Sequence, residues 1–169
     1  LRSWKQSADR ESTLFESRER EQFLLGGYFS LAVLITLVSI ANALAFRDRN
    51  FAVYAVYVAA LAVGQLAYLG VGAQHVWDQW LRWNELATFV LPGVSAAAGV
   101  WFTQTVTEPA RFSRALDLAV WALIAALLSS VALDAVMATR ASFLLQISLT
   151  SLALVVIVAL VAVAWAHDE

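Results

Sequence analysis

Residues 141–166 read ASFLLQISLTSLALVVIVALVAVAWA and contain no Asp, Glu, Lys or Arg. Apolar side chains occupy every face that a helix of this sequence would present, which is the pattern of a helix surrounded by lipid or protein. At 1.5 Å per residue the stretch is long enough to cross a bilayer core, which needs about 20 apolar residues. It therefore predicts a membrane-spanning helix.

Four further stretches without charged side chains precede it, at 23–46, 51–77, 86–107 and 118–133. The last is short, and it reaches spanning length if its helix starts near Ala115 and continues past Asp134 toward Ala138. Short connections favour antiparallel neighbours, and the strict alternation of a membrane strand is missing. The sequence thus predicts an all-α, up-down bundle of five transmembrane helices, with spans at 23–46, 51–74, 86–107, 115–138 and 141–166.

The composition supports a lipid environment. Hydrophobic residues make up 61% of the chain and charged residues 14%, whereas a soluble domain is about half apolar and a quarter charged. The net charge of -2 offers no basic surface, so we expect no nucleic-acid partner. The chain has no cysteine, which excludes disulfides and thiol chemistry.

Residues 1–22 differ from the bundle at 23–169 because charges of both signs alternate along them. Glu16 and Arg20 stand at the i, i+4 spacing that favours a helix, and no Pro or Gly separates them from Phe23. A stalk helix continuous with the first span and a solvated linker are the two alternatives. The segment has no signal-peptide pattern and no initiator Met, so we expect the chain to be part of a longer protein.

Tryptophans cluster in the second connection, where Trp77, Trp80 and Trp83 recur every third residue. Tryptophan prefers the headgroup level of a bilayer, so the pattern predicts interfacial anchors on a short helix lying in the interface over 77–85. A cage of tryptophans around a ligand is the alternative.

The arginines of the connections favour one orientation. The first and third connections hold four of them and the second and fourth hold two, in order Arg47, Arg49, Arg111, Arg114, and then Arg82 and Arg140. Short cytoplasmic loops are enriched in Lys and Arg, which places the first and third connections in the cytoplasm and the N-terminus outside. The arginines ahead of the first span favour the opposite orientation.

Several short segments occur in an order that is similar to a known family. They are LGGYF at 25–29, Asn42, RDRNF at 47–51, Tyr54 and Tyr57, GVGAQ at 70–74 with Trp77, WF at 101–102, Pro109 and Arg114. In this order, over residues 25–116, they resemble the membrane module of bacterial seven-transmembrane receptors with diverse intracellular signalling modules (the 7TMR-DISM family).

The resemblance implies a receptor of the bacterial inner membrane that carries a sensor domain outside and an output domain in the cytoplasm. The output would be a diguanylate cyclase, or else a histidine kinase, fused beyond this chain. It also implies an extracytoplasmic N-terminus, a cytoplasmic C-terminus and a linking role for residues 1–22. The chain departs from the family in having five spans in place of seven, and both odd numbers leave the two termini on opposite sides.

Catalytic and cofactor chemistry find no support in the residues. His75 and His167 have no metal-ligand spacing, and the single lysine, Lys5, lies outside every span. The glycines at 70–73 end an apolar helix and lack the context of a phosphate loop. We therefore predict no catalytic, cofactor-binding or metal site and no enzyme activity in this chain.

Uncharged polar residues inside the spans are the candidates for ligand binding or for relaying motion, namely Tyr28, Asn42, Gln65 and Gln146. Gln104 has the same character. The alternative is that such residues only join neighbouring helices by hydrogen bonds. Asp134 is expected at the headgroup level, since a charge deeper in the membrane would be costly and functional.

Small residues in the third span favour close approach of a neighbouring helix. Gly93 and Ala97 are four residues apart, as are Ser95 and Gly99, and Pro92 is expected to kink this helix. We expect helix packing at Gly93, Ala97 and Gly99, with a homodimer seam as the alternative.

These observations together predict a signal-relay module. Ligand binding outside, or within the bundle, would shift the helices and bias the output between two states. A transporter or channel subunit is the alternative, and a membrane enzyme is a third hypothesis. Intramembrane charges and internal repeats would favour a transporter or channel, and clustered catalytic side chains would favour an enzyme. The sequence offers little of each.

Overall fold

The structure is a computed structural model that describes residues 2–75, 79, 81–137 and 139–168, with side chains at 23–73, 79, 83, 85–137 and 139–166. In chain order the elements are α1 (Arg2–Phe46), α2 (Arg49–Tyr68), α3 (Val71–His75), α4 (Leu81–Thr107), the 3-10 helix η1 (Pro109–Arg111), α5 (Arg114–Met137) and α6 (Arg140–Asp168). No strand occurs in these described ranges, so the predicted all-α class is confirmed.

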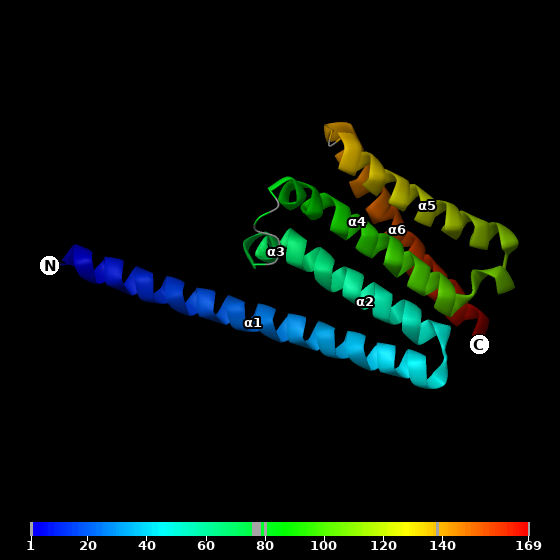
Figure 1. The fold of residues 1–169 in the computed structure, drawn as a ribbon, viewed down its shortest axis with the longest axis horizontal. Coiled ribbons are helices and arrows are strands. Elements are labelled where there is room, and N and C mark those ends of the chain that lie inside the picture. The colour runs from blue at the N-terminus through cyan, green and yellow to red at the C-terminus, as the bar shows by residue number, and fades with distance from the viewer. Residues whose placement is uncertain (1, 76–78, 80, 138, 169) are drawn as a thin grey trace.

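Five helices are long and apolar enough to cross a membrane. Their spanning segments are Phe23–Phe46, Arg49–Tyr68, Glu85–Thr107, Arg114–Met137 and Arg140–Ala166. Consecutive spans run in opposite directions (Figure 1), which confirms the up-down bundle. The α1–α2 and α4–α5 connections consequently lie at one end of the bundle, and the α2–α4 and α5–α6 connections lie at the other.

Helix α1 is a single helix of 45 residues, and its N-terminal half projects beyond the rest of the molecule (Figure 1). At 1.5 Å per residue it is about 67 Å long, whereas the hydrocarbon core of a bilayer is about 30 Å thick. Of the two alternatives for residues 1–22, the structure therefore has the continuous helix over 2–22.

A tight turn joins α1 to α2. Arg47 has a left-handed φ of 51°, and the Asp48 side chain accepts a hydrogen bond of 2.8 Å from the backbone N–H of Asn50. Asp48 is the N-cap of α2, so α2 begins at Arg49, two residues before the predicted span.

Helix α2 ends earlier than predicted. It stops at Tyr68, and Gly70 adopts a φ of +72°, a conformation that glycine reaches without the strain of a side chain. The glycine segment thus ends an apolar helix as predicted, but the span does not reach residue 74, because the five-residue α3 follows as a separate element.

The predicted interfacial helix over 77–85 is wrong in its second half. Residues 81–85 form the first turn of α4, and Trp83 is half-buried there. Trp77 and Trp80 lie outside the described residues. Helix α4 then continues through Pro92 to Thr107.

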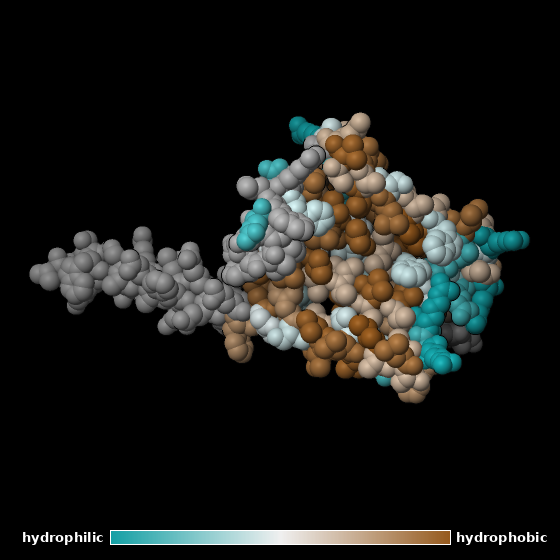
Figure 2. All heavy atoms as spheres, viewed as in Figure 1, coloured by the Kyte–Doolittle hydropathy of each residue, from teal (hydrophilic) through white to brown (hydrophobic). Residues whose placement is uncertain are grey.

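Helix α4 is the centre of the bundle. It packs against α2, α5 and α6, whereas α1 packs chiefly against α2. Within the most apolar window of each helix, 44% of α4 is buried, compared with 11% of α1 and 11% of α6. The outer helices therefore offer most of their surface to lipid, and the apolar sides seen in Figure 2 agree with this.

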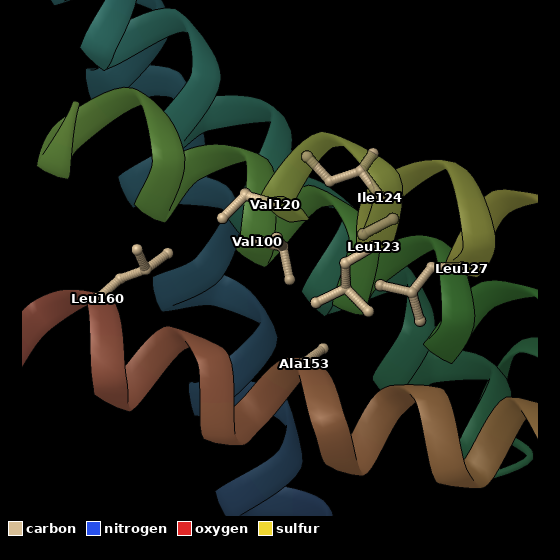
Figure 3. Close-up of a cluster of buried hydrophobic side chains, with 8 residues drawn as sticks. Val100, Val120, Leu123, Ile124, Leu127, Ala153 and Leu160 are labelled. Carbon is tan, nitrogen blue, oxygen red and sulfur yellow. The ribbon is translucent and has the colours of Figure 1, made fainter. Parts of the chain in front are cut away.

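A core cluster fills the space where three helices meet (Figure 3). Val100 from α4 and Leu127 from α5 are fully buried, and Ala153 of α6 closes the third side. Lipid tails are as apolar as these side chains, so burial alone does not drive helices together in a bilayer. The cluster stabilises the bundle through close van der Waals packing.

Charged side chains gather at one end of the bundle. Four exposed arginines lie in the α1–α2 and α4–α5 connections or at the first residue of the helix that follows, namely Arg47, Arg49, Arg111 and Arg114. We call this the arginine-rich end. Figure 2 shows the hydrophilic surface concentrated there, and Arg111 forms an ion pair with Glu108.

Candidate transmembrane relay site

Small residues of α4 let three helices approach its backbone. A Cβ atom at Gly93 would lie 2.5 Å from Val131 Cγ2 of α5 and 2.6 Å from Gln146 Nε2 of α6. Real Cβ contacts are never this short, so α5 and α6 converge on α4 at a place where no side chain fits. Ala97 is buried one turn further along α4, in the core cluster.

Gly99 and Ser95 face a different neighbour. A Cβ atom at Gly99 would lie 3.1 Å from the Tyr57 ring of α2. Ser95 Oγ donates to the carbonyl oxygen of Ala60 on α2 at 2.8 Å, and the second short contact of this hydroxyl is to Leu91 of its own helix. Ser95 and Gly99 thus face chiefly α2, whereas Gly93 faces α5 and α6. All of these small residues are buried.

Gln146 joins α6 to α4. Its Nε2 donates to the backbone carbonyl oxygen of Phe89, three residues before Pro92. Its Oε1 is buried and has no hydrogen-bond partner. Among the four polar candidates, Gln146 is the one that lies buried between helices.

Asp134 occupies an unexpected environment. Its predicted level at the headgroups did not indicate burial, yet its side chain is 4% exposed and its Oδ2 is buried without a hydrogen-bond partner. The reason is helical phase. Asp134 continues the buried stripe of α5, which includes Leu127, Ser130 and Val131, so it points between helices although it lies one turn from the helix end.

The ends of α5 and α6 at their connection agree with the predicted spans to within one residue. Helix α5 continues past Asp134 to Met137, and α6 begins at Arg140. The Thr139 N–H donates to Ser142 Oγ at 3.1 Å, and the Ser142 N–H donates to Thr139 Oγ1 at 3.2 Å. These reciprocal bonds satisfy donors of the first turn of α6 and fix the hairpin of α5 and α6.

A groove of about 460 Å³ runs between α2, α4 and α6. Its floor is made by small residues of α4, and its polar lining consists of Tyr57, Gln65, Tyr68, Ser95, Thr150 and Ser151. These positions follow helical stripes on the three helices. Gln65 is the sequence candidate that the structure places here.

Aromatic and polar contacts tie α4 to its neighbours near the arginine-rich end. The Tyr57 and Phe102 rings are stacked with centroids 5.7 Å apart, and Tyr54 lies 5.2 Å from the same Phe102 ring. Gln104 Nε2 donates to Asp117 Oδ1 of α5 at 3.0 Å. These contacts couple α4 to both α2 and α5 at this end.

The remaining polar candidates lie elsewhere. Tyr28 is 40% exposed on α1 and contacts the edge of Phe29, and Asn42 is half-buried on the same helix. The four candidates therefore do not form one pocket. Sequence reasoning missed Ser95 as a link between helices and Asp117 as the partner of Gln104, although the small-residue spacing did include Ser95.

Within the described ranges, no group of three or more His, Cys, Asp or Glu side chains could hold a metal ion. Ser95, Gln104 and Gln146 each donate a hydrogen bond to a neighbouring helix, and many large apolar side chains are exposed. The fold and these contacts define a polytopic helical membrane module built around one central helix.

Comparison with known proteins identifies the kind of module. Residues 21–169 match the family model described as 7TM diverse intracellular signalling, and the chain belongs to this family. The resemblance found in the sequence is thereby confirmed, and the family makes the chain a transmembrane sensory module of a signalling receptor. No curated protein and no solved structure matches the chain.

Proposed function

We propose that this bundle relays an extracytoplasmic signal to a cytoplasmic output domain of the same receptor, without catalysing a reaction itself. The output domain is a diguanylate cyclase, with a histidine kinase as the second choice. The observation that carries the proposal is the uninterrupted helix α1, which extends from outside the bundle through the full span. Such a helix transmits displacement or rotation where a flexible linker would absorb it.

The packing supports a route for that motion. Helix α1 rests chiefly on α2, and α2 rests on α4 along an interface without room for adjustment at Gly64. A Cβ atom there would collide with Ser95 of α4. Because packed cores are bistable and not continuously deformable, a shift of α1 is passed on as a change between discrete arrangements.

The orientation in this proposal is N-terminus outside and C-terminus in the cytoplasm of the inner membrane. It is supported by the positive-inside rule, since the arginine-rich end then faces the cytoplasm. In this orientation α6 ends at the cytoplasmic face, where an output domain would follow.

The test uses the complete receptor in membranes and asks whether the stalk connects sensor and output. Residues 9–22 are replaced by a Gly/Ser sequence of equal length and, in a matched control, by a helix-forming Ala/Glu/Lys sequence. Output activity is measured with the extracytoplasmic domain present and deleted. We expect the deletion to change output in the wild type and the helical control but not in the Gly/Ser variant. An equal effect of the deletion in all three would refute the relay through α1.

A further inference from the structure

Two buried acceptor oxygens near the α5–α6 hairpin lack donors. Asp134 is 4% exposed and Gln146 is 6% exposed, and Asp134 Oδ2 and Gln146 Oε1 have no hydrogen-bond partner. Both are strong acceptors, and buried polar atoms are satisfied in the great majority of native structures. Each of the two oxygens could therefore be satisfied by a hydrogen-bond donor or by a cation.

The two side chains lie about one helical turn apart along the bundle, on facing helices. Gly93 fits between Val131 of α5 and Gln146 of α6, so these two side chains meet at one point of α4. Asp134 follows Val131 by one turn on the same buried stripe, toward the hairpin. Gln146 follows buried Ser142 by one turn of α6, away from the same hairpin. Asp134 and Gln146 therefore flank one short section of the interface between α5 and α6.

No described charge compensates Asp134. On the neighbouring helices, Glu85 of α4 and Arg140 of α6 are exposed, and Arg82 has a side chain outside the described part of the chain. In η1 and its N-cap, Arg111 and Glu108 pair with each other. On α5 itself, Arg114 and Asp117 lie at the opposite end, where Asp117 accepts from Gln104.

We propose that Asp134 and Gln146 form a binding site for one small monovalent cation, a sodium ion or a proton. A carboxylate and an amide oxygen are hard ligands of the kind that alkali and alkaline-earth cations prefer. A single carboxylate balances a single positive charge. Ser130, one turn before Asp134, adds a buried hydroxyl oxygen whose proton is donated to Leu127. A proton would instead join the two orphan oxygens as a carboxylic acid that donates to the amide.

The site lies at a place where occupancy affects packing. Gln146 also holds the α4 backbone at Phe89, and Gly93 leaves no space between α4, α5 and α6. A bound cation would therefore fasten the three helices together. Both side chains belong to the bundle, so binding of a cation there does not depend on the proposed output domain.

The experiment measures the thermal unfolding midpoint of the 169-residue chain in lipid nanodiscs. One series exchanges N-methylglucamine for sodium at constant ionic strength and pH, and a second lowers the pH without sodium. A sodium site raises the wild-type midpoint in the first series, and a proton site raises it in the second, because a ligand that binds the folded state stabilises it. Asp134→Asn keeps the shape of the side chain and is expected to remove the response.

Two further variants complete the test. Asp117→Asn makes the same charge change on the same helix and is expected to respond as the wild type does. Gln146→Leu is expected to shift the half-saturating sodium concentration, or the proton response, severalfold, and it provides a second reading if D134N does not fold. The proposal is overturned if the wild type responds to neither cation, if D134N responds like the wild type, or if D117N also loses the response.

Discussion

Replacing Gly93 with alanine should destabilise the bundle although alanine is the better helix former. The added Cβ would lie 2.5 Å from Val131 Cγ2 and 2.6 Å from Gln146 Nε2. The Val131 side chain is β-branched and stiff in a helix, and Gln146 is held by its bond to the Phe89 carbonyl. Overpacking of this kind costs about 1–3 kcal/mol, against a helix-propensity gain of about 0.5–1 kcal/mol.

The matched control is the same substitution at Gly26 of α1, where an added Cβ would meet nothing within 4 Å. G26A should be neutral or gain up to about 1 kcal/mol from helix propensity. The two variants should thus differ by about 1–3 kcal/mol, or roughly 2–12 °C in unfolding midpoint at about 2–4 °C per kcal/mol for a chain of this size. The assay is thermal unfolding in nanodiscs followed by tryptophan fluorescence.

A second substitution separates crowding from other causes. Val131→Ala removes the methyl group that the new Cβ would meet, so the double variant G93A/V131A should be more stable than the sum of the single effects predicts. Equal stability of G93A and G26A, or strict additivity in the double variant, would refute the convergence of α5 on α4 at Gly93.

Two further predictions concern an interhelical bond and the orientation. Ser95→Ala removes the bond to the Ala60 carbonyl and should lower the free energy of unfolding by about 0.6–2 kcal/mol. The control is Ser129→Ala, whose exposed hydroxyl bonds only within α5, and it should be close to neutral in the same unfolding assay. Because residues 1–169 contain no cysteine, Ala141→Cys and Ala110→Cys each introduce the one thiol of this segment, in the first turn of α6 and in η1. An impermeant maleimide added to intact cells should label A141C and reach A110C only after permeabilisation, and the reverse pattern would contradict the orientation.

The number and type of helices could be predicted because a bilayer excludes charge and demands helices of a minimum length. Runs without charged residues therefore coincide with the spans, and the resemblance of the short motifs points to the family that the comparison confirms. The end of α2 could not be located in this way. The run without charged residues continues past Tyr68 to Trp77, and the stop coincides with the left-handed backbone of Gly70, which a charge pattern does not register.

The candidate site was predictable only in part because the spans are so uniform. Long runs of Ala, Leu and Val do not reveal which face of a helix meets lipid, so the central position of α4 emerges only from the structure. Asp134 was assigned to the headgroups by its distance from the helix end, whereas its direction follows from the stripe that starts at Val120. Gln65 and Gln146 were both recognised as polar residues in spans. Gln65 lines the groove, whereas Gln146 is buried between packed helices.

The central claim is that α1 acts as a rigid lever, and a series of insertions tests it most directly. One, two, three or four alanines are inserted after Gln22 in the complete receptor, and the output activity of each variant is measured in membranes. Each residue rotates the helix by about 100° and advances it by 1.5 Å. We expect output to vary with the helical period and to return close to the wild-type level at four residues, where the rotation is about one full turn. Output that is flat, or that changes steadily with the number of residues, would contradict the account.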